Sequence, residues 1–170
     1  VRGLMGPEMA SLAFYDDPGL VEEIVDWALQ RARQYIFPLV ERLRPEIVHM
    51  GEDLCYKRGM LLGPVLFRRF FGAYYREVCE VARGCGVDLV AVDSDGNLME
   101  YVGVASSYGV NGFFPCEVKP GNDLFILRQR YPNLIFFGWL EKETVNEGNE
   151  GLIEKEIAAK VPPLLARGGY

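Results

Sequence analysis

Apolar residues along the chain follow two alternating patterns, one with helical spacing and one in short continuous runs. Between Pro18 and about Leu43 they recur every three or four residues, which predicts one long helix. Asp17 is a favourable N-cap and Pro18 suits the first helical position, whereas Pro38 predicts a kink. The other helical patterns cover residues 8–15, 64–83, 98–107, 124–130 and 150–166, the last with a break near Pro162 and Pro163.

Short apolar runs predict four strands, near residues 46–51, 87–93, 110–116 and 134–139. Residues 1–9 and 54–63 are predicted as loops. Strand and helix alternate four times, which is typical of a parallel sheet with helical crossovers. The predicted class is therefore α/β, and four such units are half of an eight-unit TIM barrel. No glycine-rich phosphate loop follows a strand, which disfavours a nucleotide-binding fold.

Length and composition indicate one domain, residues 1–170, and exclude several classes of function. A net charge of −6 argues against a nucleic-acid surface. No apolar run approaches the ~20 residues needed to span a bilayer, and the first residues lack the apolar core of a signal peptide. We expect a cytoplasmic protein that does not associate with membranes.

The four cysteines, Cys55, Cys79, Cys85 and Cys116, form no Cys-x-x-Cys pair. This spacing is typical of reduced thiols rather than of a zinc knuckle. Cys55 and Cys116 lie near strand ends and are the thiolate candidates. Lys57 and Arg58 are expected to lower the pKa of Cys55.

Acidic residues follow all four predicted strands. Glu52 and Asp53 follow the first strand, and Asp93 and Asp95 end the second. Glu117 follows the third strand, and Glu141 and Lys142 follow the fourth. In a parallel barrel these ends share one face, where catalytic groups sit.

Carboxylates gathered in one mouth require a hard metal ion, an ammonium-type substrate or a shared proton. The alternative is structural: these acids cap the helices that follow, and Asp95-Gly96-Asn97 forms an ordinary turn. His49, alone in an apolar strand, is interpreted as a packed core residue rather than a ligand.

Several segments resemble the uroporphyrinogen decarboxylase superfamily. They are Gly51-Glu52-Asp53-Leu54-Cys55-Tyr56-Lys57, Leu62-Gly63-Pro64-Val65-Leu66-Phe67, Asp93-Ser94-Asp95-Gly96-Asn97, Asn111-Gly112-Phe113-Phe114-Pro115-Cys116-Glu117-Val118 and the Gly-Gly-Tyr ending. The resemblance covers nearly the whole chain in order. It implies a TIM barrel, of which this chain is the C-terminal portion, about half.

The superfamily contains two main chemistries. Its decarboxylases remove acetate carboxyls from a tetrapyrrole without a cofactor. Its methyltransferases work with a corrinoid and activate a thiol on zinc through a His-x-Cys pair, and the matching positions here are Asp93 and Asp95. Two carboxylates suit a harder ion better than thiolate zinc.

The resemblance therefore favours a methyltransferase-type enzyme that moves a methyl group between a small substrate and a corrinoid protein. Asp93, Asp95 and Glu117 are the expected metal ligands, for zinc or a harder divalent ion. Together with Glu52 and Asp53 they form the expected catalytic set. There are two alternatives. One is a tetrapyrrole decarboxylase, which is a carboxy-lyase that needs no cofactor. The other is a non-catalytic truncated barrel that only binds or oligomerises.

Half a barrel leaves its first and last strands open to pairing with another chain. Inward residues such as Val90 and Phe136 are expected to form an exposed apolar patch. The sequence therefore predicts a homodimer or a longer chain that covers the same edges.

Overall fold

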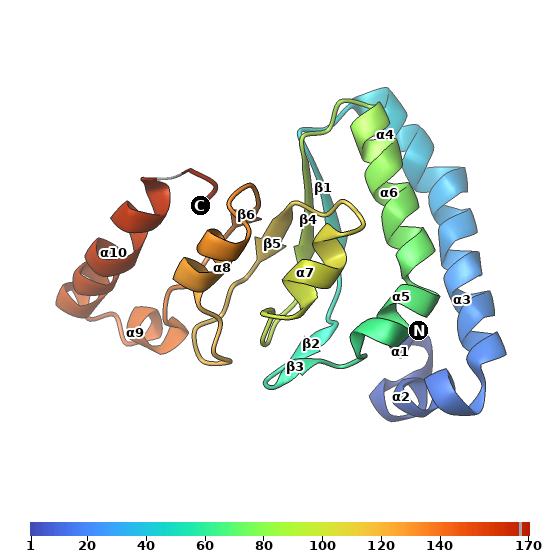
Figure 1. Cartoon of the computed structure of the whole chain (residues 1–170), viewed down its shortest axis with the longest axis horizontal. Helices are drawn as coiled ribbons and strands as arrows, with labels where there is room; N and C mark the ends of the chain where they lie inside the picture. The colour runs from blue at the N-terminus through green and yellow to red at the C-terminus, as the bar shows by residue number, and fades with distance from the viewer. Residues whose placement is uncertain (167) are drawn as a thin grey trace. The chain divides into compact units, whose positions relative to one another are not determined.

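The computed structural model describes residues 1–166 and 168–170 and shows an α/β fold (Figure 1). Four strands form one parallel sheet in the order β1-β4-β5-β6, and helices separate each strand from the next along the chain. The strands are β1 (Ile47–Gly51), β4 (Leu89–Asp93), β5 (Gly112–Phe114) and β6 (Ile135–Phe136). The predicted strand positions, their order and the parallel sheet are confirmed. The described residues form an open sheet rather than a closed barrel.

The helices mostly follow the predicted pattern, but the helix expected over residues 64–83 is divided at Phe71, and the short helix Lys142–Asn146 was not predicted. They are α1 (Arg2–Met5), α2 (Pro7–Asp16), α3 (Pro18–Arg31), the π-helical segment η1 (Ala32–Ile36), α4 (Phe37–Leu43), α5 (Pro64–Phe70), α6 (Gly72–Gly84), α7 (Tyr101–Ser106), α8 (Leu124–Arg130), α9 (Lys142–Asn146) and α10 (Glu150–Leu165). Asp17 caps α3 as predicted, because its Oδ1 accepts the N–H of Leu20 at 3.1 Å. Helix α1 and the start of α2 replace the loop expected over residues 1–9.

Proline affects the two long helices differently. Before Pro38 the expected kink is a π-helical turn, in which the N–H of Phe37 donates to the carbonyl of Ala32. Since proline has no N–H and clashes with the carbonyl four residues earlier, a wider turn accommodates it. The break expected at Pro162 in α10 is absent. The helix continues there, and the N–H of Ala166 donates to the Pro162 carbonyl at 3.0 Å.

A small antiparallel hairpin replaces most of the loop expected over residues 54–63. Its strands are β2 (Cys55–Tyr56) and β3 (Gly59–Met60), with Cys55 opposite Met60. The turn uses Gly59 at φ 125°, a conformation that glycine adopts without strain. Strands of two residues each leave little periodic signal in a sequence.

The chain divides into two compact units. The first, the helical unit, contains residues 1–48, 61–90 and 104–110, and the second, the rim unit, contains residues 49–60, 91–103 and 111–170. The helical unit has an aromatic core: the Phe67 and Tyr75 rings meet edge to face at 4.9 Å, and Phe14 meets Phe70 at 5.2 Å. The Tyr108 side chain packs on Gly72, where a Cβ would lie 2.6 Å from its hydroxyl.

The rim unit carries the carboxyl ends of the strands. Asp93 lies opposite Phe114 in the β4–β5 register, and Phe113 lies opposite Phe136 in the β5–β6 register. Tyr101, at the start of α7, packs edge to face on Phe113. The expectation that Val90 and Phe136 form an exposed patch is wrong, because both are buried, at 1% and 0% exposure. Ala91 and Val92 are buried as well, at 2% and 1% exposure, so β4 is covered on both of its faces.

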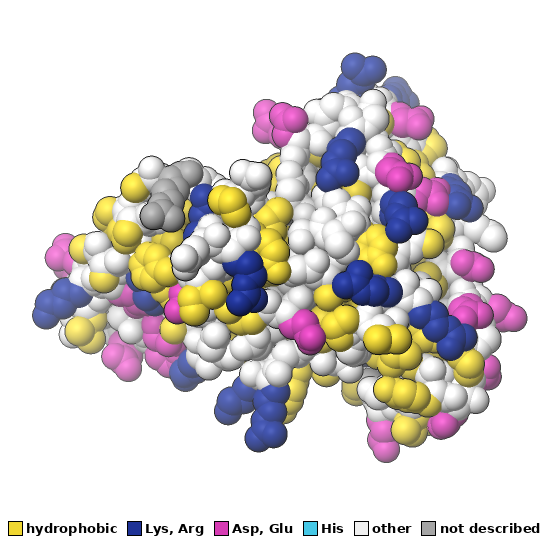
Figure 2. Space-filling view, viewed as in Figure 1, with side chains coloured by type: hydrophobic (Ala, Val, Ile, Leu, Met, Phe, Trp, Pro, Cys, Tyr) yellow, Lys and Arg dark blue, Asp and Glu magenta, His cyan; other side chains and the backbone are white. Residues whose placement is uncertain are grey.

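The charged side chains at the surface agree with the expectation, from the net charge of −6, that the chain has no basic nucleic-acid surface on the face shown in Figure 2. Basic and acidic side chains are interspersed over the face seen in Figure 2, with no continuous basic stripe. Among the described helices, none combines the length and the apolar character required to cross a membrane.

Candidate functional site

The candidate site lies at the carboxyl ends of the four strands, within the rim unit. Asp93 ends β4, and its carbonyl accepts the N–H of Glu52, the residue after β1, at 2.9 Å. The N–H of Ser94 donates to the Phe114 carbonyl at 3.0 Å. The N–H of Cys116 donates to the Phe137 carbonyl at 2.9 Å. Backbone pairing thus continues past the strands and fixes the start of each rim loop.

His49 and Asp93 form a half-exposed pair on the sheet. The Nε2 of His49 lies 3.8 Å from the Oδ2 of Asp93, and the side chains are 47% and 40% exposed. The imidazole also packs against Phe114, with 4.9 Å between ring centroids and 38° between the ring planes. The interpretation of His49 as a packed core residue is therefore wrong. At 3.8 Å the His49–Asp93 pair is not a hydrogen bond, and it is an ion pair only when the imidazole carries a proton.

Lys142 connects two of the predicted acids. Its Nζ contacts the Oε1 of Glu117 and lies 3.8 Å from the Oδ1 of Asp95. The N–H of Gly96 donates to the other carboxylate oxygen of Glu117 at 2.8 Å. Burial alone would raise the pKa of Glu117, but the bonds from Lys142 and Gly96 outweigh it, and the pKa is lowered. Glu117 is thus an ionised, fully paired carboxylate.

Ser94 holds the hairpin to the loop after β4. Its side chain is fully buried, and its Oγ accepts the N–H of Cys55 at 2.9 Å and donates to the Asp95 carbonyl at 3.1 Å. The N–H of Asn97 donates to the Tyr56 carbonyl at 2.9 Å. Buried polar groups need such partners, so Ser94 fixes two rim loops relative to each other.

Asn122 holds three rim loops together. The side chain is 4% exposed, and its Nδ2 donates to the carbonyls of Gly96 and Glu117 at 2.8 Å each. Its Oδ1 accepts the N–H of Leu98 at 2.7 Å. Its carbonyl accepts the indole N–H of Trp139, from the loop after β6, at 2.6 Å. The rim is therefore preorganised by buried hydrogen bonds.

The predicted residues form two groups rather than one ring of acids. Asp93 lies beside His49, and Asp95 and Glu117 meet at Lys142. Glu52 is joined to the site by its backbone N–H, which donates to the Asp93 carbonyl, and Asp53 is exposed. Within residues 1–166 and 168–170, no group of three or more His, Cys, Asp or Glu side chains is placed to hold a metal ion.

The cysteine predictions need correction. Burial raises the pKa of Cys55 to about 12, and likewise that of Cys116 to about 12. The expectation that Lys57 and Arg58 lower the pKa of Cys55 is wrong. Both cysteines are neutral thiols at physiological pH, because thiolates are costly in apolar surroundings.

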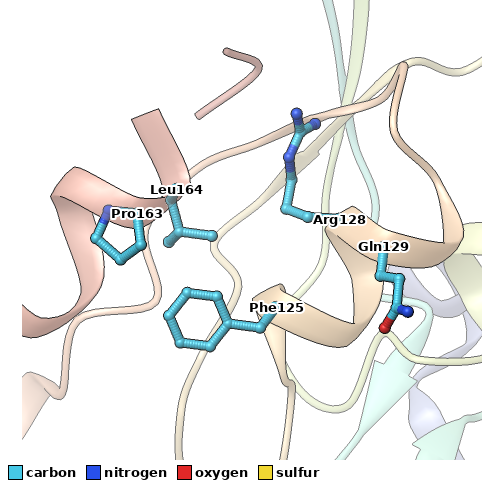
Figure 3. Close-up of a pocket in the computed structure, with 5 residues that line it drawn as sticks. All are labelled: Phe125, Arg128, Gln129, Pro163 and Leu164. Atoms are coloured by element: carbon cyan, nitrogen blue, oxygen red, sulfur yellow. The ribbon is translucent and has the colours of Figure 1, made fainter. Parts of the chain in front are cut away.

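A separate hollow of about 380 Å³ lies between α8 and α10. Its lining residues are Phe125, Arg128, Gln129, Pro163 and Leu164, and Phe125 and Leu164 point toward each other across it (Figure 3). The Arg128 guanidinium donates to the carbonyls of Leu134 and Gly168. None of the predicted site residues lines this hollow, and its arginine holds backbone in place.

Comparison with models of protein families, with curated proteins and with solved structures gives no significant match. The site therefore has to be interpreted from its own geometry. Sequence reasoning left His49, Asn122 and Lys142 out of the site. Lys142 had a signal, since it follows the fourth strand just as the acids follow the others.

Proposed function

We propose that the chain belongs to an enzyme of the uroporphyrinogen decarboxylase-like type that transfers a methyl group between a small substrate and a corrinoid protein. The observation that carries the proposal is the half-exposed His49–Asp93 pair beside Phe114 at the carboxyl ends of parallel strands. This is where parallel α/β enzymes place catalytic groups. The four strands would be half of an eight-stranded barrel.

His49 is the proposed proton-transfer group. Histidine is suited to this role because its unperturbed pKa lies near physiological pH. Asp93, 3.8 Å away, would orient the imidazole and stabilise its protonated form. Phe114 would provide the apolar wall against which a small substrate lies.

The proposed reaction moves the methyl group from a heteroatom of the substrate to the cobalt of the corrinoid. The bonding electron pair stays on the heteroatom, which then takes a proton from His49. The corrinoid, carried by a partner protein, would supply the reduced, nucleophilic cobalt. No metal-dependent step is proposed, since Asp95 and Glu117 are engaged by Lys142 while Asp93 faces His49.

Methyl transfer is favoured over decarboxylation of a tetrapyrrole for one reason. A polycarboxylate substrate needs free cations at the mouth. Lys142 contacts Glu117 and lies 3.8 Å from Asp95, so its charge is already balanced within the chain, and the exposed Lys57 and Arg58 of the β2–β3 turn are too few cations for a polycarboxylate.

The proposal is tested by mixing the 170-residue chain with reduced cobalamin and a panel of methylated amines, thiols and phenyl ethers. The readout is the absorption change as methylcobalamin forms. His49→Ala should slow the reaction by about 10²-fold or more, the usual contribution of a general acid. Glu154→Gln on α10, an exposed position, should leave the rate unchanged. No transfer from any donor, or an unchanged rate in His49→Ala, would contradict the proposal.

A further inference from the structure

The outer face of the long N-terminal helix carries a continuous row of exposed apolar side chains. Leu20, Trp27, Tyr35, Leu39 and Leu43 are 39%, 55%, 48%, 51% and 69% exposed. The opposite face is buried in the helical unit, through Val21, Val25, Leu29, Ala32 and Phe37. Single exposed apolar residues are normal, but an aligned row of five is not.

The π-helical segment keeps this row straight. In a regular α-helix, residues four apart rotate by about 40° per step, so Trp27, Tyr35 and Leu39 would drift around the axis. The wider turn of η1 offsets part of that rotation. Arg31 lies in the same row, with its guanidinium 5.1 Å from the Trp27 ring and 5.0 Å from the Tyr35 ring.

Charge along the same helix is strongly polarised. The charged residues of its amino-terminal part, residues 17–26, are all acidic: Asp17, Glu22, Glu23 and Asp26. Its carboxyl-terminal part, residues 31–44, carries Arg31, Arg33, Arg42 and Arg44 against a single Glu41. Glu22 and Arg33 are used within the unit, in ion pairs with Arg69 and Glu77. Glu23 and Arg42 are exposed and form no ion pair within residues 1–166 and 168–170.

We propose that this helix face is a self-association surface that binds a second copy of the chain in antiparallel orientation. With the two-fold axis near Arg33, Trp27 of one copy lies on Leu39 of the other. Glu23 then lies beside Arg42 of the second copy, and the symmetry makes this pair twice. The two acidic halves meet the two basic halves, and the helix dipoles are antiparallel, so a parallel arrangement is disfavoured.

The dimensions of the row indicate a reversible dimer. Residues 20–43 extend about 36 Å at 1.5 Å per residue, roughly the diameter of a small domain. One helix pair of this length falls at the lower end of specific interfaces in buried area. Trp27, Tyr35 and Arg31 are the residue types that most often dominate binding energy at interfaces.

The test is analytical ultracentrifugation of the 170-residue chain from micromolar to sub-millimolar concentration. Wild type should pass from monomer to dimer over this range. Glu23→Arg and Arg42→Glu should each weaken the dimer by about tenfold or more, because each puts like charges opposite each other twice. Leu152→Ala, a comparably exposed apolar position on α10, should leave the dimer constant unchanged.

Charge reversal also gives a rescue test that a folding defect cannot mimic. An equimolar mixture of the Glu23→Arg and Arg42→Glu proteins should form a heterodimer of near wild-type affinity, because both contacts are then between opposite charges. The double variant should likewise regain the homodimer. Circular dichroism checks that each variant keeps its helix content. A monomer at every concentration, a dimer unaffected by either reversal, or a mixture that fails to associate would overturn the proposal.

Discussion

The helical unit and the rim unit are stabilised by different kinds of contact. The helical unit depends on buried aromatic side chains such as Phe67 and Tyr75, while its ion pair between Arg33 and Glu77 lies at the surface. The rim unit also buries aromatic side chains such as Phe113 and Phe136, but its loops at the strand ends are held by a few buried polar side chains, chiefly Asn122. Apolar packing tolerates conservative changes in shape, whereas a buried hydrogen-bonding group leaves several partners unsatisfied when it is lost. The rim should therefore be the more sensitive region to small substitutions.

The largest effect is expected for Asn122→Leu, which sharpens this comparison. The change removes three side-chain hydrogen bonds and leaves buried carbonyl and N–H groups unpaired. We expect a loss of about 4 kcal/mol in the free energy of unfolding, measured by urea denaturation. Phe67→Leu in the helical core should cost less, about 2 kcal/mol, because it leaves a small cavity and removes the ring contact with Tyr75. Equal losses would show that the two regions do not differ.

The sequence predicts the features that depend on neighbouring residues and misses those that depend on contacts between residues far apart in the chain. The strands and the helix starting at Pro18 follow from local periodicity and capping, so they were predicted well. The hairpin was missed because it depends on Ser94, which is 39 residues from Cys55. The environment of His49 was misjudged because an apolar strand does not reveal which face is covered. Long-range burial likewise decides the pKa of Cys55.

Glycine provides the next contrast. Gly96, in the rim, has φ 91°, and a Cβ there would lie 2.7 Å from the Tyr56 backbone nitrogen. Gly96→Ala should therefore cost about 2–3 kcal/mol, since backbone strain and a backbone clash add. Gly84 ends α6, and a Cβ there meets nothing within 4 Å. Gly84→Ala should raise stability by about 0.5 kcal/mol. Thermal and urea unfolding of both variants measure the difference, and a well-tolerated Gly96→Ala would contradict the rim geometry.

Two serines allow the same comparison for a single hydroxyl. Ser94→Ala in the rim leaves the buried N–H of Cys55 without its acceptor and should cost about 1.5 kcal/mol. In the helical unit, Ser11 donates to the Pro7 carbonyl at an exposed position, and Ser11→Ala should change stability by less than about 0.5 kcal/mol. Hydrogen exchange of the Cys55 amide provides a second readout, which should accelerate only in Ser94→Ala. Unchanged protection of that amide would remove Ser94 from its proposed role.

The smallest expected effect is the pH dependence of stability. Glu77 in the helical unit and Glu117 in the rim unit should both lose their stabilising contribution as the pH falls. The pKa of Glu77 is lowered chiefly by its hydrogen bonds from Arg33. At Glu117, burial raises the pKa, but the bonds from Lys142 and Gly96 outweigh it, and the pKa is also lowered. A lowered folded-state pKa means that the stabilisation is present above the unfolded pKa and is lost as pH falls through the folded one.

Both Glu77→Gln and Glu117→Gln should therefore differ from wild type at pH 7 and converge with it in strong acid. Because both pairs are solvent-screened, we expect less than about 1 kcal/mol each at pH 7. Urea unfolding as a function of pH measures this. Adding salt should reduce the Glu77 effect more, because the Glu77 side chain is 28% exposed and the Glu117 side chain only 18%. A difference that grows as pH falls below 4 would contradict the sign of both shifts.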